Sequence, residues 1–146
     1  MAFNKHWLQG RYTPKNPHKY VGDLSKVVYR SSYELQMHQF LDNNERVLQW
    51  SSEEVVIPYV KPTDGKVHRY FPDYWVEYVN RDGEILQEII EVKPKAQTRS
   101  PRTNSKYRLY ESATWAINMA KWKAADTFCQ QNNMKFRIIT ERSVFK

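Results

Sequence analysis

Apolar residues recur every three or four positions in two segments of the chain, which predicts two amphipathic helices. The first covers residues 31–43, where Ser31 and Glu34 form the S-x-x-E pattern of a capping box. The second covers residues 105–131. The large or apolar side chains at helical spacing in this second segment are Trp115, Met119, Trp122, Ala125 and Cys129. We expect both helices to pack one face against a common core.

Alternating and β-branched segments predict four strands, at residues 54–59, 69–79, 84–93 and 136–140. A three-residue loop joins the second and third strands and places Gly83 where such loops favour a left-handed residue. The resulting order, α-β-β-β-α-β, predicts an α/β fold around a mixed sheet. We expect a single domain over residues 1–146, with an irregular basic arm at 1–28 and the core at 31–140.

The composition is that of a folded, basic protein. The chain has 146 residues, the size of one ordinary domain, and 40% of them are hydrophobic. Lys and Arg outnumber Asp and Glu by 23 to 16, a net charge of +7. Basic residues concentrate in the arm and between 93 and 123, interleaved with Tyr and Trp, which suits a polyanion. Charge alone favours nucleic acid only slightly over an ordinary basic protein.

Several other classes find no support in the sequence. There is no run of about 18 apolar residues to span a membrane, and the first residues lack the apolar stretch of a secretory signal. The single cysteine suits a reducing cytoplasm. The four histidines have no Cys partner at zinc-site spacing. Cys129, Trp115 and Trp122 are interpreted as core residues rather than as a catalyst or base-stacking platforms.

Charged residues on two neighbouring strands form the candidate site. With Asn80 facing Glu84 across the hairpin loop, counting back along both strands places Asp73 opposite Glu91. Alternate residues of a strand share a face, so Lys93 lies on the same side as Glu91, whereas Ile90 and Val92 face the core. A proline-aspartate pair and an E-x-K pattern are each common, and exposed Glu and Lys on a strand are usually a solvated face. Their combination in register is rarer.

Two opposed carboxylates predict a bound cation. Facing β-carbons on adjacent strands lie roughly 4.5–5.5 Å apart, where like charges destabilise a sheet. A divalent cation relieves this repulsion by taking oxygen ligands from both carboxylates. A metal that polarises water and phosphate, beside the ammonium of Lys93, is what phosphodiester cleavage requires.

The Pro72-Asp73 and Glu91-Val92-Lys93 segments resemble the motif of the PD-(D/E)xK nuclease superfamily, whose core has the same α-β-β-β-α-β order. The resemblance implies a restriction-endonuclease-like fold in which the Asp and Glu hold Mg²⁺ and the Lys assists the attacking water. It also implies a role for Glu34, which matches an acidic position on the first helix of that superfamily.

Most of the chain further resembles the head completion nucleases of T-even-type tailed bacteriophages. The segments that carry this likeness include residues 17–20, 29–31, 57–59, 69–73, 91–94 and 121–125. The resemblance implies a role in late virion assembly on packaged DNA, with phage portal or head proteins as partners. It places the protein in the host cytoplasm during assembly and leaves open whether it stays in the virion.

We therefore expect an endonuclease that uses Mg²⁺ or Mn²⁺ to cleave double-stranded DNA. Asp73, Glu91 and the Val92 carbonyl are the expected metal ligands, with Glu34 and Lys93 completing the catalytic group. The expected phosphate contacts are Arg30, Lys95, Arg99 and Arg102. Two alternatives remain open: a structural head or neck protein that binds DNA or the portal without cutting, and a transposon-end or junction-resolving nuclease with the same core.

Overall fold

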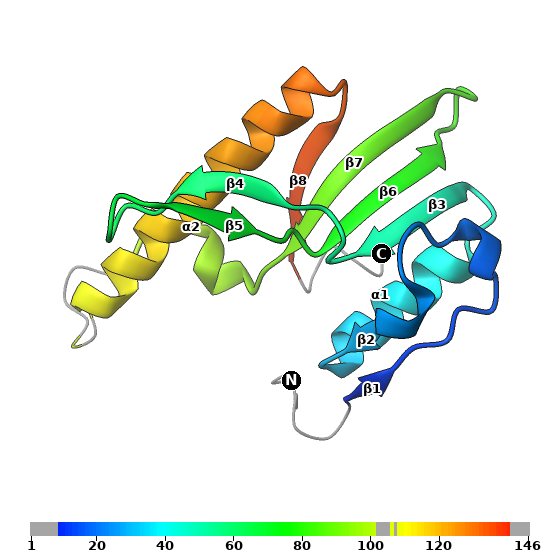
Figure 1. The fold of residues 1–146 in the computed structure, drawn as a ribbon, viewed down its shortest axis with the longest axis horizontal. Helices are drawn as coiled ribbons and strands as arrows, with labels where there is room; N and C mark the ends of the chain where they lie inside the picture. Colours follow the sequence, from blue (N-terminus) through cyan, green and yellow to red (C-terminus); the bar gives the residue numbers. More distant parts are fainter. Residues whose placement is uncertain (1–8, 102–105, 107, 141–146) are drawn as a thin grey trace.

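A four-stranded sheet lies at the centre of the computed structural model (Figure 1), which describes residues 9–101, 106 and 108–140. Its strand order is β3-β6-β7-β8, formed by Val47–Ser52, Tyr74–Val79, Ile85–Val92 and Lys135–Ile139. Strands β3, β6 and β7 pair antiparallel, and β8 pairs parallel to β7. The predicted α/β fold with a mixed sheet and two helices is confirmed.

The two helices have sequence signals at their ends. Helix α1 spans Ser32–Asn43, and the Ser31 side chain caps it by accepting a hydrogen bond from the backbone N–H of Glu34. Helix α2 spans Arg108–Gln131. It ends where Asn133 adopts a left-handed conformation (φ 56°) and Met134 N–H donates to the Cys129 carbonyl, the pattern of a Schellman motif. Residues 105 and 107, within the expected start of this helix, lie outside the described part of the chain.

The predicted strand positions needed two corrections. Strand β3 was missed, because its sequence, Val-Leu-Gln-Trp-Ser-Ser, lacks strict alternation. The segment expected at 54–59 supplies β4 (Ile57–Val60), which pairs with β5 (Val67–Tyr70) in a separate hairpin between β3 and β6. The segment expected at 69–79 contains the end of β5 and all of β6. The second segment breaks at Pro72, a buried residue that has no N–H for a strand ladder. The order α1-β3-β6-β7-α2-β8 still matches the expected core.

Hydrophobic clusters cover both faces of the sheet. One cluster joins α1 through Met37 and Leu41 to Trp50, Tyr74 and Ile90. The other joins α2 to the β4–β5 hairpin and β8. Its buried members are Ile57, Tyr59, Tyr70, Trp122 and Ala125. Figure 1 shows the corresponding layers, with α1 and α2 on opposite sides of the sheet. As predicted, Cys129 and Trp122 are buried.

The basic arm is anchored to α1 by a buried carboxylate. The arm contains β1 (Gly10–Arg11), η1 (Pro17–Lys19) and η2 (Leu24–Lys26), and it leads into β2 (Val28–Tyr29). Asp42 is fully buried and accepts hydrogen bonds from the Tyr12 hydroxyl and the backbone N–H groups of Lys15 and Asn16. The Lys19 ammonium donates to the carbonyls of Asp42 and Asn44. Lys19 is therefore a buried structural residue rather than part of a cationic surface.

Among the described residues, neither helix is sufficiently long and apolar to cross a lipid bilayer.

Candidate active site

Asp73 and Glu91 meet where strands β6 and β7 end. Gly83 is left-handed (φ 80°), and the N–H of Asn80 donates to the carbonyl of Glu84, as the sequence predicts. The register that follows pairs Tyr74 with Ile90, so the next positions along the two strands bring Asp73 opposite Glu91. Oδ2 of Asp73 accepts a 2.7 Å hydrogen bond from the backbone N–H of Val92. This contact fixes the aspartate against the strand that carries the Glu91-Val92-Lys93 motif.

A cavity of about 330 Å³ opens at this end of the sheet. Charged side chains from four parts of the fold line it: Glu34 of α1, Glu53 after β3, Asp73 before β6, and Glu91 with Lys93 at the end of β7. All four of the catalytic residues expected from the sequence therefore share one cavity. Glu53 is a fifth charged residue there, and the sequence did not indicate it.

The cavity makes ionisation of Asp73 unfavourable. Burial raises the pKa of Asp73 well above its ordinary range, and the nearby carboxylates of Glu91 and Glu34 raise it further. The hydrogen bond from Val92 and the ammonium of Lys93 act in the opposite direction without cancelling the rise. A positive charge added near these carboxylates would remove most of the repulsion.

Glu91 is buried, contrary to the expectation that its face of β7 points away from the core. Only 6% of its surface is exposed, because α2 and the β4–β5 hairpin cover that side of the sheet. Each carboxylate oxygen has a partner: Oε1 accepts a 2.7 Å hydrogen bond from the Tyr70 hydroxyl, and Oε2 lies 3.4 Å from Nζ of Lys93. Lys121 of α2 lies above the Tyr70 ring, 5.6 Å from its centroid.

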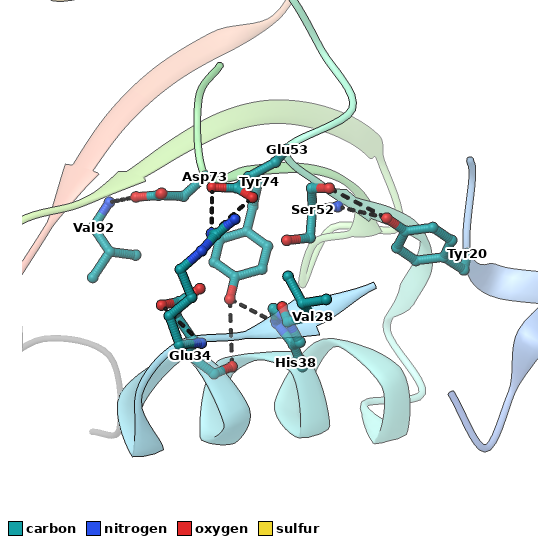
Figure 2. A network of polar contacts seen from close by, with 10 residues as sticks. Tyr20, Val28, Glu34, His38, Ser52, Glu53, Asp73, Tyr74 and Val92 are labelled. Atoms are coloured by element: carbon teal, nitrogen blue, oxygen red, sulfur yellow. Dashed lines mark hydrogen bonds and ion pairs between the residues drawn. The ribbon is translucent and has the colours of Figure 1, made fainter. Parts of the chain in front are cut away.

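Glu34 reaches the cavity from the first turn of α1. Its carboxylate accepts a hydrogen bond from the backbone N–H of Arg30 (3.3 Å), whereas the capping-box pattern predicted Ser31 as the donor. The same helix is tied to the start of β6 by His38, shown in Figure 2. The His38 Nε2–H donates to the Val28 carbonyl, so Nδ1 accepts from the Tyr74 hydroxyl at 2.7 Å. Burial lowers the pKa of His38, which favours this neutral form.

Asp73 and Glu91 offer the oxygen ligands that Mg²⁺ and Mn²⁺ prefer. The residue between the two motif positions, Val92, also lines the cavity. Within the described residues, no three side chains of His, Cys, Asp or Glu are placed to hold a metal as a group. A metal held by Asp73 and Glu91 would thus need further ligands from the backbone and from water.

The expected phosphate contacts are only partly described. Nη1 of Arg30 lies 2.9 Å from both carboxylate oxygens of Glu53. Arg99 is exposed after η3 (Lys95–Thr98), close in sequence to Pro94 and Gln97, which line the cavity. The side chain of Lys95 and all of Arg102 lie outside the described part of the chain.

Sequence reasoning missed three residues that shape the site: Glu53, Tyr70 and His38. Glu53 follows a strand that was not predicted, so nothing indicated its direction. Tyr70 was assigned to the same strand as Asp73, and its contact with Glu91 depends on the break at Pro72. His38 occupies an apolar helix face, where a histidine gives no specific signal.

Comparison with known proteins gives two matches. Residues 44–141 match a family model described as the N-terminal domain of TnsA-like endonucleases. The head completion nuclease of Enterobacteria phage T4 is 40% identical over 139 residues, which cover 90% of this chain and 90% of that protein. Both matches include the segments that carry Asp73, Glu91 and Lys93.

Proposed function

This chain belongs to the family of TnsA-like endonucleases, and on that premise we propose that it is a metal-dependent enzyme that cleaves double-stranded DNA. Membership of the family makes it a nuclease with a restriction-endonuclease-like fold. The proposal adds three points: the use of Mg²⁺ or Mn²⁺, the residues that act, and the biological setting.

The observation that carries the proposal is the placement of two carboxylates and an ammonium in one cavity. Asp73 and Glu91 face each other on neighbouring strands, and Lys93 lies 3.4 Å from Glu91. A stable fold has little reason to bury two acids together, since each raises the cost of ionising the other. Such clusters are typical of functional sites. The residues therefore fit a divalent cation.

In this proposal Asp73, Glu91 and the Val92 carbonyl hold Mg²⁺ or Mn²⁺, which when bound polarises the phosphate and the attacking water. Lys93 donates hydrogen bonds that orient the water and stabilise negative charge developing on the phosphate. Glu34 completes the acidic cluster from α1. Arg30, Lys95, Arg99 and Arg102 bind DNA phosphates around the cavity.

We further propose that the enzyme acts in the completion of phage heads, on packaged DNA, with portal or head proteins as partners. The T4 relative is named for head completion, and its similarity extends over 90% of the chain. That range includes much of the N-terminal arm, which the family model at residues 44–141 leaves out. This setting places the protein in the host cytoplasm during assembly.

The match to the TnsA-like model also supports a second candidate, a nuclease that acts on transposon ends or DNA junctions. Incubating the protein with supercoiled plasmid, linear duplex, nicked duplex and four-way junction, each with Mg²⁺, Mn²⁺ or EDTA, separates the possibilities. Metal-dependent cutting of plasmid and linear duplex supports the proposal. Cutting confined to junctions supports the second candidate. Binding without cutting in every metal would identify a structural DNA-binding protein instead.

A further inference from the structure

Glu53 has an unusual backbone conformation at the edge of the cavity. Its φ is 55°, and the other described residue of this kind besides glycine is Asn133. Asn133 has a local explanation, since it ends α2 and asparagine tolerates the left-handed region. Glutamate adopts the left-handed region only with strain, so the backbone conformation at Glu53 lowers the stability of the fold. Its N–H donates to the Asp73 carbonyl at 3.1 Å, a contact that glycine would make equally well. The side chain therefore needs its own explanation.

The Glu53 side chain holds Arg30. Both of its carboxylate oxygens lie 2.9 Å from Nη1 of Arg30, and 55% of the arginine side chain and 35% of the glutamate side chain remain exposed. An exposed ion pair of this kind contributes little stability. The stabilisation from this ion pair is thus smaller than the strain of the Glu53 backbone, which points to a functional role for the pair.

The pair also lies beside the acidic cavity. Glu53 raises the pKa of Arg30 most strongly, by hydrogen bonding, and Glu34 and Asp73 act on the same guanidinium at longer range. Figure 2 shows Glu34, Glu53 and Asp73 around this region, between α1 and the start of β6. Among the described residues, only Nη1 of the Arg30 guanidinium has an ion-pair or hydrogen-bond partner. The remaining N–H groups of this planar guanidinium are available for a bidentate contact with two oxygens of a phosphate.

We propose that Glu53 is a positioning residue that holds the Arg30 guanidinium at the mouth of the cavity, where the guanidinium binds a phosphate of the DNA backbone. A long side chain fixed before binding loses less conformational freedom when the phosphate arrives, so binding is tighter. This inference rests on the proposed function, because it assumes that DNA enters this cavity.

The glycine variant provides a sharp test. Glu53→Gly keeps the left-handed conformation and removes only the side chain, and Asn133→Gly is the matched control at the other left-handed position. We measure the melting temperature, the affinity for a linear duplex in EDTA at several salt concentrations, and kcat and KM for plasmid nicking. For Glu53→Gly we expect an unchanged or higher melting temperature, roughly tenfold weaker DNA binding, and a salt slope lower by about one unit. KM should rise while kcat changes less than threefold.

Further variants link the effect to the arginine. Arg30→Ala should weaken DNA binding by a similar factor. A double variant that combines Arg30→Ala with Glu53→Gly should bind DNA as tightly as either single variant. Glu53→Gln keeps the size and the backbone cost, so it should melt at the wild-type temperature and weaken DNA binding in the same direction as the glycine variant. Asn133→Gly should bind and cut DNA as the wild type does.

Three results would overturn the proposal. Wild-type DNA affinity in Glu53→Gly would show that the side chain positions nothing. A large fall in its melting temperature would make Glu53 a structural residue. A fall in kcat with weaker Mn²⁺ binding by calorimetry would make it part of the metal site rather than a support for Arg30. The binding measurements need no cleavage, so a wild type that binds DNA but never cuts it would contradict the proposed function and leave this inference testable.

Discussion

The Tyr70 hydroxyl donates a 2.7 Å hydrogen bond to Oε1 of Glu91, on the side of the carboxylate opposite the Lys93 ammonium. Burial raises the pKa of Tyr70 far above its ordinary value, and Glu91 raises it further, so the phenol is protonated at neutral pH and can donate this hydrogen bond. Tyr70 is the last residue of β5. The inserted hairpin thus supports the strand that carries the Glu91-Val92-Lys93 segment.

Tyr70→Phe keeps the ring in the core and removes only this donor. One oxygen of Glu91 is then left without its buried partner, which should lower stability by roughly 1–3 kcal/mol. Because the carboxylate is also less well oriented, we expect metal-dependent nicking to fall about 10–100-fold. Titrating Mg²⁺ in a plasmid assay checks this. Tyr59→Phe, an aromatic change in the same cluster, is the control. Equal losses in the two variants would show that the Tyr70 hydroxyl has no special role.

The Glu34 carboxylate accepts a hydrogen bond from the Arg30 N–H at the start of α1 and also lines the cavity, and a pair of variants can separate the roles expected of these two positions. Glu34→Gln keeps an acceptor and removes the charge, whereas Glu34→Ala removes both. We expect the Gln variant to melt near the wild-type temperature and bind DNA but cut it poorly, and the Ala variant to lose about 1 kcal/mol as well. Nicking by the Gln variant at the wild-type rate with saturating Mg²⁺ would leave Glu34 as a cap only.

The parts of the fold that could be predicted are those specified by short-range patterns. The hairpin between β6 and β7 is such a case, since Gly83 and the Asn80 side chain fix the loop and the loop fixes the register. From that register alone, Asp73 could be placed opposite Glu91. The S-x-x-E pattern likewise gave the start of α1.

The parts that could not be predicted depend on tertiary packing. Strand β3 places Trp50 in the core through contacts with α1 and the arm, and its own sequence has no clear period. The burial of Glu91 follows from α2 and the hairpin, which pack over a face that looks polar in sequence. The Arg30–Glu53 pair joins two segments 23 residues apart through a backbone conformation that glutamate rarely adopts.

The loop after β7 offers a test of where DNA passes. Replacing Lys95, Arg99 and Arg102 together by Ala should weaken binding to unrelated duplexes alike. It should also flatten the salt dependence by about one unit of slope for each phosphate that the variant no longer binds. The control replaces Arg46 and Arg81, exposed residues at the other end of the sheet, by Ala. An unchanged slope in the loop variant would place the DNA elsewhere.

Asp42 predicts a dependence of stability on pH. Burial alone would raise its pKa, but the hydrogen bonds from Tyr12, Lys15 and Asn16 outweigh that effect and lower the pKa. The contribution of Asp42 to the free energy of unfolding is therefore complete above the unfolded-state pKa of about 4. It is lost as the pH falls through the lower folded-state pKa. Asp42→Asn should cost roughly 1–3 kcal/mol at pH 7, because the new amide N–H groups then face donors where the carboxylate accepted.

Thermal unfolding at pH 7 and at several pH values from 4 downward checks this expectation. The difference between wild type and Asp42→Asn should shrink in acid, where the wild-type carboxylate becomes protonated. The exposed Asp82 in the β6–β7 loop provides the control, and Asp82→Asn should unfold like the wild type at both pH values. A difference for Asp42→Asn that stays constant with pH would mean that its hydrogen bonds, rather than its charge, determine the loss.

Plasmid nicking by Asp73→Asn tests the central claim most directly. Asparagine can still accept a hydrogen bond from the Val92 N–H, and it removes the repulsion from Glu91. The metal-free variant should therefore melt at or above the wild-type temperature, with a free energy of unfolding higher by about 1 kcal/mol or less. With that control in place, the rate of nicking is measured across Mg²⁺ concentrations. We expect a saturable, EDTA-sensitive rate for the wild type and no cutting above background for the folded variant. Nicking by Asp73→Asn at the wild-type rate would contradict the assignment of this cavity as the active site.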